Sequence, residues 1–194
     1  MGMVLKNGKL VSGFVIFIRR SEATDRELLQ AVNAADHELI EPSSTDHPTF
    51  GRLPPAATQG RNTVTIGNTA DWTLIADDGS YRIFHEERSS GIVSAFLATG
   101  DEAFTYTMGD SDESHGFSYW LKGQRVRSYD VAPHWKSPPP PVEQGAPLPV
   151  ESDIDDHTYE RGLKVGVAMG FDPCDAEGSF RTYRSEKRTV DIGP

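Results

Sequence analysis

Hydrophobic residues fall mainly into short runs that are bounded by turn-forming residues, and this pattern is typical of β-strands. The first run, residues 14–18, is apolar at every position and predicts a central strand buried on both faces. Further strands are predicted at residues 63–66, 72–76, 81–84, 104–108, 117–121 and 125–131. Turn residues at 77–80 predict a hairpin between 72–76 and 81–84. A second turn at 122–124 indicates that 104–131 is an antiparallel meander.

The clearest helix signal follows the first strand. Thr24 and Glu27 have the spacing of a capping box, in which each residue satisfies a backbone N–H of the first turn. Apolar residues then recur at helical intervals and predict about three turns; they are Leu28, Leu29, Val32 and Ala35. Residues 92–97 fit a short capped helix, although their β-branched residues leave a strand as the alternative.

A last helix is predicted before Gly170 and Pro173, which mark its end. Either Asp153 or Asp155 would cap its start. Its apolar positions would be Tyr159, Leu163, Val167 and Met169. The tail at 181–188 is either a terminal strand or a loosely held end.

Proline-rich segments separate these elements. Four prolines between residues 40 and 62 predict a long irregular loop. Residues 133–149 contain seven prolines and predict a stiff connector of polyproline II type. The chain is long enough to bury one core without disulfides. We therefore predict a single α+β domain over residues 1–194, with a mainly antiparallel sheet of about six to eight strands and two or three helices packed on it.

The charge balance points to the kind of partner. The chain has 29 acidic and 19 basic residues, a formal charge of −10, so its average field repels nucleic acid and anionic membranes and favours a basic protein. Segments 101–114 and 143–160 contain no Lys or Arg. They are either solvated loops or a partner-binding surface. The candidate partner-binding residues are Asp101, Glu102, Asp110, Asp112, Glu113, Asp153, Asp155 and Asp156.

Catalytic and metal motifs fail at particular positions. A calcium loop starting at Asp110 would need Gly at its sixth position and Glu at its twelfth, where His115 and Leu121 stand. Ser118 lacks the second glycine of a nucleophile elbow, because Trp120 occupies that place. No HExxH pattern occurs. We therefore predict no catalytic residue, metal or cofactor; the alternative is a small hydrolase using Asp or Glu with His, with or without a divalent metal.

Three segments together resemble a known family: the tryptophan-bearing segment 71–79, FSYWLKGQRVRSY at 117–129, and the helix end at 167–173. Their order resembles that of small α+β immunity proteins encoded beside bacterial polymorphic and type VI secreted toxins. The resemblance implies a cytoplasmic inhibitor that binds a cognate toxin and occludes its active site. A nuclease is the expected toxin, because its basic groove would suit acidic patches. A third possibility is a scaffold whose prolines at 138–141 dock in an aromatic groove.

The expected location is cytoplasmic on two further grounds. Cys174 is the only cysteine, which fits a reducing compartment. The apolar run at 14–18 is too short for a signal peptide core or a membrane span.

Overall fold

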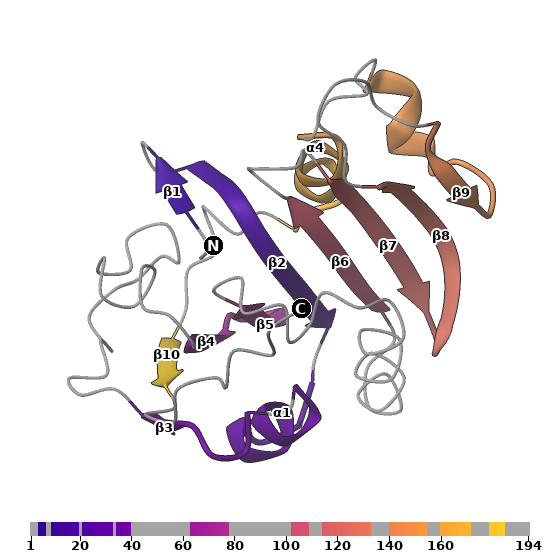
Figure 1. The fold of residues 1–194 in the computed structure, drawn as a ribbon. Coiled ribbons are helices and arrows are strands. Elements are labelled where there is room, and N and C mark those ends of the chain that lie inside the picture. Colours follow the sequence, from indigo (N-terminus) through magenta and orange to yellow (C-terminus); the bar gives the residue numbers. More distant parts are fainter. Residues whose placement is uncertain are drawn as a thin grey trace.

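A computed structural model describes residues 4–6, 9–19, 21–32, 34–39, 63–77, 102–108, 114–132, 140–154, 160–171 and 179–184. These residues form an antiparallel sheet of ten strands, with two α-helices and one 3₁₀ helix (Figure 1). The strands are β1 (Val4–Lys6), β2 (Lys9–Arg19), β3 (Glu38–Leu39), β4 (Thr63–Asn68), β5 (Trp72–Asp77), β6 (Glu102–Met108), β7 (His115–Leu121), β8 (Gln124–Val131), β9 (Val142–Gln144) and β10 (Ser179–Arg184). The helices are α1 (Asp25–Ala31), η2 (Pro149–Asp153) and α4 (Arg161–Ala168).

The predicted α+β class with a mainly antiparallel sheet is confirmed, but the sheet has more strands than the six to eight expected. The two α-helices of the described residues stand at the lower end of the prediction. The additional strands include β1, β3 and β9, which have two or three residues each. Such short strands show no readable alternation of apolar and polar residues, so they escaped the sequence pattern.

The strands are arranged in the order β3-β10-β4-β5-β2-β6-β7-β8-β9, and β1 pairs with β2. β2 therefore lies inside the sheet, between β5 and β6. Each of Val15, Ile16, Phe17 and Ile18 is at most 2% exposed. This confirms the prediction of a central strand that is buried on both faces.

The two faces of the sheet have different cores, because successive side chains of a strand point to opposite sides. From β2, Val15 and Phe17 enter a largely aromatic core, whereas Ile16 and Ile18 enter a largely aliphatic one. The aromatic core is covered by α4, which packs on β6 and β7. The aliphatic core receives Leu28, Leu29 and Val32 from α1 and its C-terminal end. In Figure 1, α4 lies beside the upper end of the β6–β8 meander and α1 lies below β2.

α1 begins as predicted and ends sooner. The Thr24 hydroxyl accepts from the backbone N–H of Glu27, and the Glu27 carboxylate accepts from the backbone N–H of Thr24. This confirms the capping box. The helix has seven residues and its C-cap is Val32, so it has about two turns instead of three. Ala35 is exposed and takes no part in the apolar stripe.

The strands predicted at 63–66 and 72–76 are confirmed as β4 and β5, but the hairpin is different. β5 pairs with the preceding strand β4 on one edge and with β2 on the other. Both edges of β5 are therefore occupied, whereas the partner predicted for this strand is residues 81–84. Those residues, the loop at 40–62 and the segment at 92–97 lie outside the described residues.

The meander predicted for 104–131 is confirmed as β6, β7 and β8. A two-residue turn joins β7 to β8, and both of its residues have positive φ, 48° at Lys122 and 77° at Gly123. Turns of this type match the twist of a hairpin, and glycine adopts such angles without strain. The register shifts after Tyr119, which leaves Val126 as an extra residue in β8.

The last helix starts later than predicted. Asp153 belongs to the 3₁₀ helix η2, and Asp155 lies outside the described residues; α4 begins at Arg161 instead. Its end agrees with the prediction, because Gly170 has φ 87° and the N–H of Phe171 bonds the carbonyl of Gly166 at 2.8 Å. That geometry closes a helix with a left-handed glycine.

The predicted apolar face of this helix is correct in part: Leu163 and Met169 pack against the aromatic core, and Tyr159 lies outside the described residues. Val165 is fully buried, whereas Val167 is 44% exposed. Gly162 and Gly166 face the sheet at very short range: a Cβ at Gly162 would lie 2.9 Å from the carbonyl oxygen of Gly116. The lack of side chains at these two positions lets α4 approach the sheet closely.

Two segments that the sequence left irregular or open contain a strand among the described residues. Residues 142–144 of the predicted proline-rich connector form β9, which pairs with β8. Residues 179–184 form β10, which lies between β3 and β4. Of the two alternatives for the tail, the terminal strand is thus correct for this part. Among the described residues, no helix is long and apolar enough to cross a membrane.

Candidate functional site

The structure describes two of the eight predicted partner-binding residues, Glu102 and Asp153. The other six lie outside the described residues: Asp101, Asp110, Asp112, Glu113, Asp155 and Asp156. Cys174 also lies outside them.

Glu102 stands at the start of β6 and is engaged inside the protein. Its carboxylate forms an ion pair with Nε of Arg19 at 3.0 Å and accepts a hydrogen bond from the Tyr119 hydroxyl at 2.7 Å. Burial raises the pKa of Tyr119, and the hydrogen bond to Glu102 raises it further. The Arg19 guanidinium in turn lies 4.6 Å from the ring centre of Trp72. Glu102 therefore links neighbouring strands and offers little charge to a partner.

Asp153 is the last residue of η2, and its side chain is exposed. It accepts one hydrogen bond of 3.3 Å, from the hydroxyl of the adjacent Ser152. Its charge faces solvent, so Asp153 remains a candidate for partner binding.

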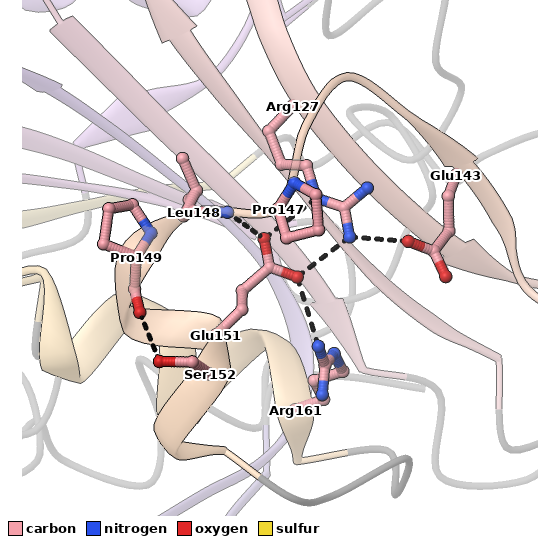
Figure 2. A pocket seen from close by; sticks show the side chains of 8 residues that line it. All are labelled: Arg127, Glu143, Pro147, Leu148, Pro149, Glu151, Ser152 and Arg161. Atoms are coloured by element: carbon pink, nitrogen blue, oxygen red, sulfur yellow. Dashed lines mark hydrogen bonds and ion pairs between the residues drawn. The ribbon is translucent and has the colours of Figure 1, made fainter.

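Beside η2 the structure contains a hollow of about 620 Å³, between β8, β9 and the start of α4 (Figure 2). Its lining combines two arginines and two glutamates with an apolar turn. The lining residues are Arg127, Glu143, Pro147, Leu148, Pro149, Glu151, Ser152 and Arg161.

Arg127 is the centre of the charged lining. It is 2% exposed, and Nε and Nη2 donate to the two carboxylate oxygens of Glu151 at 2.9 and 2.8 Å. Nη2 also donates to Glu143 at 2.7 Å. Such paired donation to one carboxylate has the geometry of the strong arginine–carboxylate interaction. The hydrogen bonds to Glu151 and Glu143 raise the pKa of Arg127.

Glu151 is 5% exposed and fully bonded. Besides the two bonds from Arg127, it accepts from the backbone N–H of Leu148 at 2.7 Å and from Nη2 of Arg161 at 3.1 Å. Burial alone would raise the pKa of Glu151, but these donors outweigh it and lower the pKa below its ordinary value. Figure 2 shows the Glu151 carboxylate between the two guanidinium groups.

The network connects three separate elements: Arg127 comes from β8, Glu151 from η2 and Arg161 from the start of α4. The Arg161 guanidinium also bonds the carbonyl of Ile154 at 3.0 Å and lies 5.0 Å from the ring centre of Tyr129. The Glu143 side chain, 44% exposed, closes the network on its solvent side. With the two arginines matched by two glutamates, this arrangement is a clamp that holds η2 against the sheet.

A run of acidic residues along the chain does not indicate this clamp, because their partner Arg127 lies outside the run. Glu143 and Glu151 were assigned to an acidic segment without basic residues, yet both bind Arg127, which is distant in sequence. The alternation of residues in β8 does indicate the clamp. Alternate residues of a strand point to the same face, so Arg127 points to the same side as Tyr129 and Val131, which are both buried. An arginine at an inward position needs a carboxylate partner.

A second cluster joins α1 to β10. The Asp25 carboxylate accepts from Nη2 of Arg181 at 2.6 Å and also bonds Nε of Arg181 and the hydroxyl of Tyr183. Burial raises the pKa of Asp25, but the bonds from Arg181 and Tyr183 outweigh it and lower the pKa. Burial and Asp25 together raise the pKa of Tyr183 to about 12. This cluster also holds two elements together.

The described residues contain no group of three or more His, Cys, Asp or Glu side chains that could hold a metal ion. Ser118 is a residue of β7, as the sequence indicated. Comparison with family models, curated proteins and solved structures found no match for the chain.

Proposed function

We propose that this protein is an immunity-type inhibitor that binds and neutralises a cognate bacterial toxin. The proposed target is a nuclease, and binding uses an acidic surface that includes the solvent side of η2. The proposal joins the family resemblance of segments 71–79, 117–129 and 167–173 to the charge distribution of the chain.

The inward orientation of the arginines around η2 is the observation that supports this surface. Arg127 and Arg161 are 2% and 8% exposed, and both bind Glu151. Their positive charges are therefore matched inside the protein. Asp153, in contrast, is exposed on η2, and its charge faces solvent. Carboxylates presented in this way attract a basic protein.

The rest of the charge balance is consistent with this proposal. Acidic and basic residues are nearly equal in number among the described residues, so most of the surplus of −10 belongs to the remaining segments of the sequence. Asp155 and Asp156 stand two and three residues after the end of η2 in the sequence. The proposed binding surface includes both of them with Asp153.

A calorimetric titration against the toxin domain encoded beside this gene tests the proposal. We expect the combined variant Asp153→Lys, Asp155→Lys and Asp156→Lys to weaken binding at least 10-fold, mainly through slower association, and wild-type binding to weaken as salt increases. The control is Asp71→Lys, which reverses an exposed acidic residue in the turn between β4 and β5.

The inhibitor function and the position of the binding surface are tested by different outcomes. No binding by the wild-type protein at low salt would count against the inhibitor function. Binding that is weakened equally by Asp71→Lys and by the combined variant would refute the location and leave only a general effect of net charge.

A further inference from the structure

Residues 142–154 wrap round the edge of β8. They begin as β9, which pairs with β8 through Ser128–Gln144, Tyr129–Glu143 and Asp130–Val142. They end as η2, which packs near α4 on the aromatic face of the sheet. We call residues 142–154 the strap.

The strap has few apolar contacts of its own. All three residues of β9 are exposed, Val142 to 63%. Leu148, Val150 and Ile154 are only partly buried against the aromatic core. Glu151 is the one residue of the strap in the buried class, and its bonds to Arg127 and Arg161 attach η2 to both β8 and α4. The β9 end is held separately, by its pairing with β8 and by the hydrogen bond from Arg125 to Gln144 at 2.7 Å.

Gly145 is the point at which the strap turns off the edge of β8. Its φ is 77°, and a Cβ there would lie 2.0 Å from the carbonyl oxygen of Val126. Val126 is the extra residue of the β8 bulge. Only glycine allows this approach, so the turn depends on Gly145 independently of Glu151.

We propose that the strap is a releasable cover, locked by Glu151, that keeps β8 from pairing with β8 of a second copy of this chain. β8 has eight residues, of which three pair with β9. An uncovered strand of this length at a sheet edge presents a row of unpaired N–H and C=O groups that accepts another strand. Two identical edges can pair antiparallel about a two-fold axis.

The strap is itself a poor template for such pairing. β9 is short, and Pro140 and Pro141 directly precede it. Proline has no N–H to donate, and short edges that carry proline resist the addition of a strand. The closed strap thus covers the edge of β8 at Ser128–Asp130 with a short strand that proline precedes, and it crosses that edge at Gly145 beside Val126.

Glu151 is the lock because it binds both other elements. The charged groups that face it are Arg127 from β8 and Arg161 from α4, with Glu143 on the far side of Arg127. An amide in place of the carboxylate has one acceptor oxygen and no charge. Glu151→Gln therefore breaks the attachment while keeping the size of the side chain.

Hydrogen exchange measured by mass spectrometry, together with light scattering after size-exclusion chromatography, tests the strap. In Glu151→Gln we expect exchange in the peptides of residues 142–154 and of the outer edge of β8 to rise roughly 100-fold or more. Exchange in β2 and β6 should be unchanged, and the fraction of dimer should rise with concentration. Glu160→Gln, which removes an exposed ion pair with Lys164, is the matched control and should change neither.

Gly145→Ala is a second variant that should open the strap, and it leaves every charged residue in place. It should reproduce both effects, because the added Cβ cannot fit beside Val126. Unchanged exchange in β8 in both variants would overturn the lock. Faster exchange in the strap without any increase in the fraction of dimer would overturn the protective role. An equal rise of the hydrogen-exchange rate in β2 would show global unfolding and would also overturn the proposal.

Discussion

Two sets of substitutions in the network of Arg127, Glu151 and Arg161 should change the free energy of unfolding by different amounts. One breaks the ion pairs and leaves a buried charge, and the other replaces all three charged residues with apolar ones. The first perturbation is Arg127→Met. It leaves Glu151 buried with only the N–H of Leu148 and Arg161 as donors. The second is the triple variant Arg127→Met, Glu151→Leu and Arg161→Met, which removes all three charges and keeps similar volumes.

The structure sets the expected magnitudes. Arg127→Met removes two bonds to Glu151, of 2.9 and 2.8 Å, and hydrogen bonds to charged groups contribute roughly 1.5–3 kcal/mol each. Breaking a buried ion pair on one side costs about 3–5 kcal/mol, which agrees with that total. The triple variant leaves no buried charge, because Glu143 is 44% exposed and can be solvated. We expect its stability to lie within about 1 kcal/mol of the wild type, or above it.

Urea denaturation followed by tryptophan fluorescence and by far-UV circular dichroism measures both free energies of unfolding. The two probes should agree, and the slope of the free energy with urea should not change. A triple variant as unstable as Arg127→Met would refute the reasoning, because the loss would then come from packing and not from an unpaired charge. A loss below about 1 kcal/mol in Arg127→Met would show that the network is effectively solvated.

Three further predictions concern the stability of the fold, each measured by chemical denaturation. Gly162→Val should destabilise the protein by about 1–3 kcal/mol, because its Cβ would lie 2.9 Å from the Gly116 carbonyl oxygen. The control is Val167→Ala on the exposed face of α4, which should change stability by less than about 0.5 kcal/mol. Asp25→Asn should cost about 1–2 kcal/mol at pH 7. In the wild type the pKa of Asp25 is lowered from 3.8. The stabilisation that the Asp25 carboxylate provides is therefore present above pH 3.8 and is lost as the pH falls through the lowered pKa. The difference in free energy of unfolding between the wild type and Asp25→Asn should shrink in that pH range. Thr24→Ala should cost about 1 kcal/mol by removing the cap of α1.

The sequence predicted those parts of the fold that local patterns determine. The apolar run at 14–18 identified the central strand, Thr24 with Glu27 identified the start of α1, and residues 104–131 identified the meander. Each of these signals lies within a few residues of the structure it specifies. The strand β9 and the insertion of β10 between β3 and β4 depend on pairing between distant segments, which periodicity does not report.

The candidate site was harder to predict for a related reason. A run of acidic residues shows how much charge a segment has, but the direction of each side chain depends on what packs against it. Glu151 points inward to Arg127, whereas Asp153, two residues later, faces solvent. Glu102 is likewise committed to Arg19 and Tyr119. The alternation within β8 marks Arg127 as inward and would have indicated a buried ion pair.

The position of β10 has a consequence for the order in which the protein folds. The strands β6 to β8 follow one another in the chain, so the entropy lost in closing the turns between them is small. β10, at 179–184, inserts between β3 and β4 and is held to α1 through Arg181 and Asp25. Those contacts span most of the sequence, so we expect the meander to form early and the β3–β10–β4 side to close last. During synthesis β3 and β4 are made long before β10, the strand that pairs with both of them.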